Sequence, residues 1–434
     1  MSQDHKLSLP AAILVNINIM MGAGIFINTV ELAKRAGSLG GITYLLVGTL
    51  LLPLIISIAR LVNMYPEGGF YTFAQKEINS FAGFISSWSY FTGKLASATL
   101  MMHASVHLIQ QLIPPLAVIH PLIFDGCILS IFVTCNMLNI KTGSYIQALF
   151  MGLKSVPITF AILTGLFLIF NKSVTTPNFV WTGITSSLPL VLYATTGFEA
   201  SCSLSNKIKD AHRNGPLAIF ISYGIVVLIA FLYQTVLYTS LGSILTDAGS
   251  YLFAFPALTN TLLPLKVVIT SKLNMMLHLA IASSALGGAY GIIFSNNWNL
   301  YTLAQNNHTF FPTFFTTLNK HAIPFACVLV EGLICATYFI FTQGTTVGLQ
   351  QVAALGCVLA YTLSVLALFI AKINRPTLSI SAWIPILGLV NCSVLIATCL
   401  KNFFTSGMTP LFAFIGLLAI GAIMFVTTKK LTQL

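Results

Sequence analysis

Charged residues are scarce in this chain, and acidic residues are the scarcest. Of its 434 residues only 7% are charged, and Asp and Glu together number nine. A soluble domain carries about 25% charged residues, so an ordinary soluble protein is excluded. The chain is 56% hydrophobic, which predicts an integral membrane protein surrounded by lipid. Nine acids also do not supply the converging carboxylates that an enzyme site needs, so we expect no enzymatic activity.

Several motifs of other functional classes are missing as well. The eight cysteines contain no C-x-x-C pair and lie in or beside apolar stretches, which indicates neither a disulfide framework nor a zinc site. No G-x-x-x-x-G-K-[ST] stretch occurs, so ATP-driven pumping has no support. His103 and His107 have the spacing of metal ligands on a helix, but no third ligand is evident. We therefore predict no metal and no cofactor.

Long apolar segments are present instead, and they divide the chain into candidate membrane spans. The hydropathy predicts twelve of them, an all-α fold. They lie near 9–32, 40–63, 80–113, 121–140, 145–170, 185–205, 216–241, 272–302, 322–342, 346–371, 380–401 and 408–427. The third and eighth are longer than a bilayer requires, which predicts tilt or projection beyond the lipid.

Lysine and arginine are distributed unevenly between the loops on the two sides. With the N-terminus in the cytoplasm, twelve fall on that side: Lys6, Arg60, Lys76, Lys141, Lys207, Lys209, Arg213, Lys320, Lys372, Arg375, Lys429 and Lys430. Six fall on the other: Lys34, Arg35, Lys172, Lys266, Lys272 and Lys401. This bias predicts a multi-pass protein of the cell (cytoplasmic or inner) membrane with both termini in the cytoplasm. The net charge of +11 then faces anionic lipid headgroups, and no nucleic-acid partner is implied.

Two of the spans contain features that interrupt a helix. In the first, Gly22 and Gly24 flank Ala23 near the middle of the apolar run, and glycine weakens a helix interior. Such a stretch is either a break that exposes backbone groups to a cavity or a site of close helix packing. The sixth span carries Gly197 and Glu199 at membrane depth. Paired interruptions in corresponding positions of two halves point to a transporter site built from inverted repeats.

Four stretches resemble the amino acid–polyamine–organocation superfamily of transporters, which share the LeuT-like fold. They are GAGIF (22–26), PEGGFY (66–71), GFEA (197–200) and the segment 285–324 ending in KHAIP. The resemblance implies a core at 1–372 made of two inverted five-helix repeats, about 9–170 and 185–372, with helices one and six broken. Residues 373–434 would add two further helices. Asn299 departs from the pattern, since many members carry arginine there.

An amino acid needs partners for both its carboxylate and its ammonium group, and a broken helix offers both. The resemblance implies that the N–H groups of Ala23 and Gly24 bind the carboxylate. The carbonyls of Met20, Tyr193 and Thr196 would bind the amine, beside Gly22 and Gly197. Tyr193 occupies the position of an aromatic gate in relatives; the alternative is an ordinary packed tyrosine.

Lys154 lies inside the fifth span, where an ionisable side chain is costly and a candidate for function. A similar lysine in relatives reaches the carbonyls of the first break in place of a sodium ion. We therefore expect coupling to protons and not to sodium. The alternative is that Lys154 snorkels to the headgroups.

The resemblance implies three further residues of the pocket wall on the third span: Lys94, Ala98 and Met101. Lys94 would disfavour a cationic substrate side chain, or it pairs with a carboxylate and touches no substrate. Glu199 is either a proton site or gate, or an acceptor for the opened backbone of span six. We expect Glu331 to be a packing or interface residue.

Together these features predict a secondary active permease for a neutral or acidic amino acid. It would work by alternating access, as a proton symporter or an exchanger. The alternatives are an antiporter of cationic amino acids or polyamines and a non-transporting membrane sensor of the same fold.

Overall fold

The computed structural model describes residues 6–22, 24–66, 68–171, 178–264, 266–342 and 346–431, and in these ranges the chain is helical with only two isolated β-bridges. The helices are α1 (Leu9–Met20), α2 (Gly24–Ala36), α3 (Gly40–Leu50), α4 (Leu52–Met64), α5 (Phe70–Glu77), α6 (Ser80–Leu112), α7 (Pro121–Asn136), α8 (Ile140–Asn171), α9 (Trp181–Thr195), α10 (Ala200–Ser203), α11 (Ala211–Leu241), α12 (Ser243–Thr246), α13 (Ala254–Leu262), α14 (Val267–Gln305), α15 (Pro312–Thr316), α16 (Phe325–Thr342), α17 (Thr346–Asn374), α18 (Trp383–Ser406) and α19 (Thr409–Leu431). Short 3₁₀ turns lie at Pro114–Val118, Ser205–Lys207 and Tyr251–Phe253.

Many of these helices are long and apolar enough to cross a bilayer. Within the described ranges seven helices meet that criterion, and the bent pairs α1/α2 and α3/α4 raise the number to nine. Three predicted spans fall on other helices: α6, which is long but more polar, α7 with 16 residues and α9 with 15. The prediction of an all-α membrane protein is thus confirmed, and the layout of twelve spans stays a prediction.

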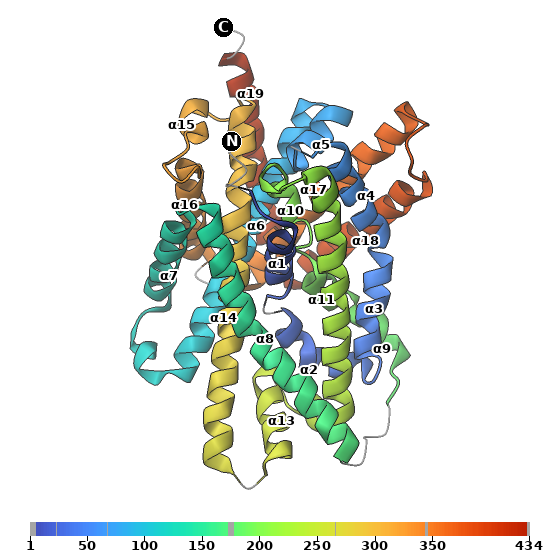
Figure 1. Ribbon diagram of the computed structural model, residues 1–434, viewed down its shortest axis with the longest axis vertical. Coiled ribbons are helices and arrows are strands. Elements are labelled where there is room, and N and C mark those ends of the chain that lie inside the picture. Colours follow the sequence, from blue (N-terminus) through green and yellow to red (C-terminus); the bar gives the residue numbers. More distant parts are fainter. Residues whose placement is uncertain are drawn as a thin grey trace.

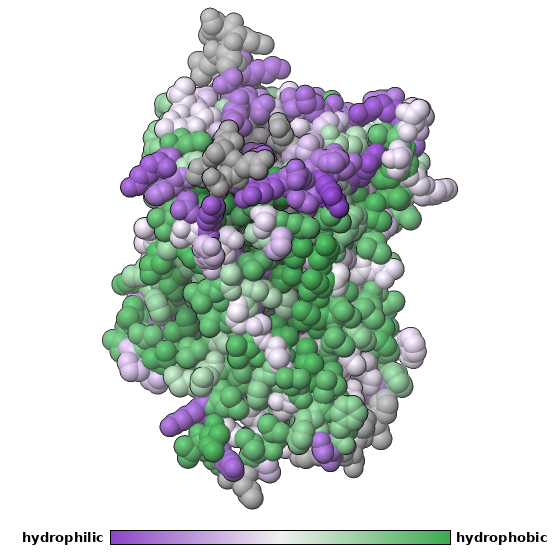
Figure 2. Space-filling view, viewed as in Figure 1, coloured by the Kyte–Doolittle hydropathy of each residue, from purple (hydrophilic) through white to green (hydrophobic). Residues whose placement is uncertain are grey.

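The surface agrees with a membrane setting. In Figure 2 a broad apolar belt covers the middle of the molecule, and hydrophilic side chains gather mainly at one end. The last described helix, α19, ends toward that same end (Figure 1). The two spans predicted to be overlong are α6 with 33 residues and α14 with 39. At about 1.5 Å per residue each is longer than the ~30 Å hydrocarbon core.

One bend was not anticipated. The predicted span at 40–63 consists of α3 and α4, which meet at 44° next to Leu51. Pro53 lies in the first turn of α4. Proline has no N–H to donate and its ring clashes with the carbonyl four residues earlier, so a continuous helix kinks there.

The interior is built around α6, which packs along α14 and α17. α1 packs against α11 and α14, and α8 crosses both α14 and α11. Figure 1 shows α1 and α2 near the middle of the molecule, surrounded by these longer helices. α1 is therefore packed among longer helices, whereas α2 packs mainly against α9.

Candidate functional site

Both predicted interruptions are present, and they face each other. α1 and α2 meet at 47°, and between α9 and α10 the chain forms a turn over residues 196–199. Gly197 has a φ of +119°, and a Cβ there would lie 3.0 Å from the backbone nitrogen of Met20. Glycine adopts this conformation without strain and leaves room for the other break. For the first interruption the sequence left a broken helix and close packing open. The structure contains the bend between α1 and α2 and also a close approach of Gly197 to Met20.

The two breaks border a small enclosed cavity of about 20 Å³, enough space for about one water molecule. Its walls come from α1, α2, α6, α9, the turn after α9, and α14. The lining residues are Ile19, Met20, Gly22, Gly24, Lys94, Ser97, Met101, Ala194, Thr196 and Ile292. The cavity therefore combines exposed helix ends with an apolar and partly charged wall.

Six of the ten residues predicted to bind substrate line this cavity, namely Met20, Gly22, Gly24, Lys94, Met101 and Thr196. Gly197 adjoins Met20 instead, and Ala98 is fully buried in the core outside the lining. Ala23 lies outside the described residues, as does the side chain of Tyr193.

The lining also contains residues that the sequence did not single out. Ser97 lies between Lys94 and Met101 along one face of α6 and takes the place expected for Ala98. Ile19, Ala194 and Ile292 supply apolar surface. The family resemblance pointed to this part of α6, and Ser97, three residues after Lys94, lies on the same helix face as Lys94.

Lys154 is fully buried and reaches the first break from α8. Its ammonium donates to the carbonyls of Asn18 and Met21, both at 2.7 Å, and to that of Ser284 at 3.4 Å. Carbonyls at the C-terminal end of a helix have no intrahelical donor and carry the negative end of its dipole. This is the contact that the resemblance implied, and a side chain so placed does not snorkel to the headgroups. Its part in coupling stays a prediction.

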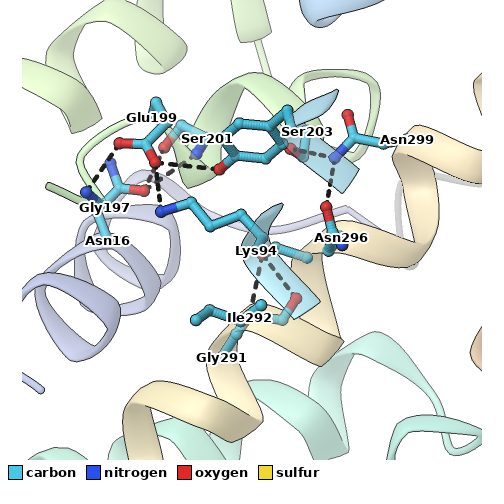
Figure 3. A network of polar contacts seen from close by, with 12 residues as sticks. Asn16, Lys94, Gly197, Glu199, Ser201, Ser203, Gly291, Ile292, Asn296 and Asn299 are labelled. Carbon is cyan, nitrogen blue, oxygen red and sulfur yellow. Dashed lines mark hydrogen bonds and ion pairs between the residues drawn. The ribbon is translucent and has the colours of Figure 1, made fainter. Parts of the chain in front are cut away.

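Glu199 accepts hydrogen bonds at the second break, whereas Lys154 donates them at the first. Its carboxylate accepts from the Gly197 N–H at 2.8 Å and from the Tyr90 hydroxyl at 3.2 Å. It also forms an ion pair of 2.6 Å with Lys94. Figure 3 shows Lys94 and Glu199 pointing toward each other, with Gly197 beside the carboxylate. Lys94 was expected either at the pocket wall or as the partner of a carboxylate. In the structure it lines the cavity and also pairs with Glu199.

Amides and hydroxyls join the broken helices to their neighbours. Asn16 on α1 accepts from both the N–H and the hydroxyl of Ser201, each at 3.0 Å. Asn299 on α14 donates to Ser203 at 2.8 Å and to Asn296 at 2.9 Å (Figure 3). Asn299 thus holds α10 against α14. Asn16 was missed, although an asparagine in an apolar run is itself a signal of a polar contact.

The outer ends of the two interrupted spans are also joined. Before α1, the Leu7 N–H donates to the Lys207 carbonyl at 2.6 Å, and the Lys209 N–H donates back to Leu7 at 2.9 Å. After α2, the Ser38 N–H donates to the Asn178 carbonyl, ahead of α9, at 2.9 Å. Each end of span one therefore pairs with the opposite end of span six.

Two other polar groups lie outside this cavity. His107 contacts His103 at 2.9 Å, and His103 contacts Asp125 at 2.6 Å. Over the part of the chain that the structure describes, no group of three or more His, Cys, Asp or Glu residues is placed to hold a metal ion. Glu331 on α16 is fully buried, and neither of its carboxylate oxygens has a hydrogen-bond partner among the described residues.

Comparisons with known proteins agree with this architecture. The sequence profile of the amino acid permease family matches residues 7–428. An uncharacterised transporter of Mycobacterium tuberculosis is 22% identical over 90% of this chain and 85% of its own length. The mouse b(0,+)-type amino acid transporter 1 is 22% identical, over 89% of this chain and 80% of its own. The human Asc-type amino acid transporter 1 is 23% identical, over 86% and 72%. Because the profile covers nearly the whole sequence, the chain belongs to the amino acid permease family, within the superfamily that its motifs resemble.

Proposed function

We propose that this protein is a secondary active transporter that carries a neutral amino acid by alternating access. The observation that supports this most directly is the cavity bounded by both helix breaks. Amino acid binding at such breaks needs no fixed ion on the protein for either end of the zwitterion. Because the cavity has room for about one water molecule, a substrate enters only when the surrounding helices move apart.

The backbone supplies the recognition of the zwitterion. Gly24 begins α2, and N–H groups at a helix start attract a carboxylate. Met20 ends α1 and Thr196 follows α9, so their carbonyls lie at helix C-termini, where an ammonium group is stabilised. The Ala23 N–H and the Tyr193 carbonyl complete this set in our proposal.

The side-chain part of the site is electrically balanced. Lys94 brings a positive charge to the cavity wall, and Glu199 neutralises it at 2.6 Å. A cationic side chain would be repelled by Lys94, while an acidic one would have to displace Glu199 or bring a proton with it. The apolar groups of Ile19, Met101 and Ile292 complete a pocket that suits a neutral side chain best.

We assign the coupling to Lys154. Its ammonium donates hydrogen bonds to the carbonyls of Asn18 and Met21. In its absence these carbonyls would be suited to bind a small cation such as sodium. Proton loss from Lys154 would release these carbonyls and loosen the first break. This favours proton symport or exchange over sodium dependence.

The repeat architecture is part of the same proposal. Residues 9–170 and 185–372 form two inverted five-helix repeats, and 373–434 add the two helices α18 and α19. The crossed pairing of Leu7 with Ile208 and of Gly37 with Phe179 is what a pseudo-two-fold axis between span one and span six would produce. The lysine and arginine bias puts both termini in the cytoplasm.

Uptake into liposomes of purified protein tests the function. Labelled alanine, glutamate and arginine would be offered with an inward proton gradient, with internal amino acid and no gradient, or with a sodium gradient. We expect alanine uptake that protons or internal substrate drive and sodium does not. Binding of alanine without uptake under any gradient would assign the protein to the sensor class, and preferred uptake of arginine would overturn the substrate assignment.

A further inference from the structure

A second and larger cavity lies away from the transport site, between α4, α11 and the segment that leads into α18. Its volume is about 530 Å³, the size of a site for a molecule of moderate mass. Its lining residues are Ile56, Ala59, Arg60, Asn63, His212, Arg213, Pro216, Phe220, Ser379, Ile380, Ser381 and Ile384. One part of this wall is basic and hydroxylated, and the other is apolar.

Within the described ranges, no acidic side chain balances the charge of the basic part. Arg60 donates to the neutral oxygens of Asn63 at 2.9 Å and Ser379 at 3.1 Å, while its Nε is buried without a hydrogen-bond partner. Among the described residues neither Arg60 nor Arg213 forms an ion pair, and Asp210, the acid nearest in sequence, pairs with neither. Two arginines beside a histidine and two serines form a site for an anion with several oxygen acceptors.

The apolar part continues onto the surface that faces lipid. Phe220 on α11 is 39% exposed, and Ile221 and Leu228 further along the same helix are exposed as well. Arg60 lies in the last turns of α4, and His212 and Arg213 in the first turn of α11. The charged end of the cavity is thus at the level of the headgroups and the apolar end at the level of the acyl chains. A basic pocket between spanning helices at this level suits the head of an anionic lipid.

We propose that this cavity binds an anionic phospholipid of the cytoplasmic leaflet, with its phosphate at Arg60 and Arg213 and its acyl chains along α11. The bound lipid joins α4 and α11 of the transport core to α18. Among ligands with a phosphate group, the apolar wall selects a lipid over a soluble phosphate, because a soluble ion would leave Phe220 and Ile384 uncovered.

Native mass spectrometry of the detergent-solubilised full chain measures this binding without any transport step. We would compare phosphatidylglycerol with phosphatidylcholine of the same acyl chains, and add glycerol 3-phosphate as a soluble competitor. The expected result is a preference for phosphatidylglycerol that falls about fivefold in Arg60→Gln and in Arg213→Gln and that glycerol 3-phosphate does not compete away.

Lys320→Gln is the matched control, since Lys320 is exposed on the same proposed side and lies outside the lining. Thermal unfolding of each variant establishes that it is folded, and Phe220→Ser tests the apolar wall independently of charge. Equal retention of both lipids, or an equal loss in Lys320→Gln and in the arginine variants, would overturn the proposal. Displacement by glycerol 3-phosphate would overturn it in favour of a soluble phosphate.

Discussion

At the α1/α2 break the exposed groups are carbonyls, and Lys154 from α8 donates to them. At the α9/α10 break the exposed group is an N–H, and Glu199, two residues along the same segment, accepts from it. The first break is held by a distant helix and the second by its own sequence, with Lys94 from α6 balancing the charge. The two breaks therefore depend on different side chains, and a separate substitution can test each.

Removal of Lys154, the side chain that reaches the first break from a distant helix, should have the largest effect on transport. In Lys154→Met the carbonyls of Asn18 and Met21 lose two charge-assisted hydrogen bonds, each worth about 1.5–3 kcal/mol. We expect alanine uptake in liposomes to fall on the order of 100-fold. Lys141→Met, an exposed lysine on the same helix, is the control. Unchanged uptake in Lys154→Met, or an equal loss in Lys141→Met, would refute the role of this contact.

The next largest effect is expected from disruption of the Lys94–Glu199 ion pair. Lys94→Met leaves a buried carboxylate without its cation, which typically costs about 3–5 kcal/mol. The free energy of unfolding in micelles should fall by about this amount, and uptake of arginine should rise relative to alanine. The double variant Lys94→Met, Glu199→Gln should lose less than the sum of the single losses. Additive losses would show that the two charges are not coupled.

Gly197→Ala tests the place where the breaks touch. A side chain at φ +119° is strained, at a cost of about 1–3 kcal/mol, and its Cβ would press on Met20. We expect a lower unfolding temperature and reduced uptake. Gly224→Ala is the control, because no atom outside its own helix backbone lies within 4 Å of a Cβ there. A destabilisation in Gly224→Ala as large as that in Gly197→Ala would contradict this explanation.

The smallest expected effect concerns His308, which follows α14 and lies outside both breaks. Burial and the nearby charge of Lys429 lower the pKa of His308 from 6.5 to about 4, and its ring contacts the Tyr71 hydroxyl at 2.8 Å. The folded protein therefore favours neutral His308. The corresponding stability is present above pH 6.5 and is lost as the pH falls from 6.5 toward 4.

The unfolding temperature of the wild type should decrease over this pH interval by more than that of His308→Gln. Uptake measured in His308→Gln then reports the pH response of the protein without the contribution of His308. Identical acid profiles of the two proteins would exclude His308 as a contributor.

Local sequence was informative wherever a backbone property decides the structure. Gly197 marks the second break, because glycine adopts its φ of +119° without strain. The two glycines of span one mark the first break, because glycine weakens a helix interior. The isolated charge of Lys154 in an apolar run indicated a polar partner, because a bilayer offers none. The bend beside Pro53 was equally local and was overlooked, since one proline near a helix start often causes no kink.

The amino-acid sequence was sufficient to predict that the chain crosses a membrane, that spans one and six contain residues that weaken a helix, and which ionisable groups lie at depth. Those follow from hydropathy and from backbone sterics, which act over a few residues. The packed structure is needed to know that Glu199 is the partner of Lys94, that Ser97 and not Ala98 faces the cavity, and that Arg60 and Arg213 line one cavity. These contacts join helices far apart in the chain, and their geometry depends on how every intervening helix packs.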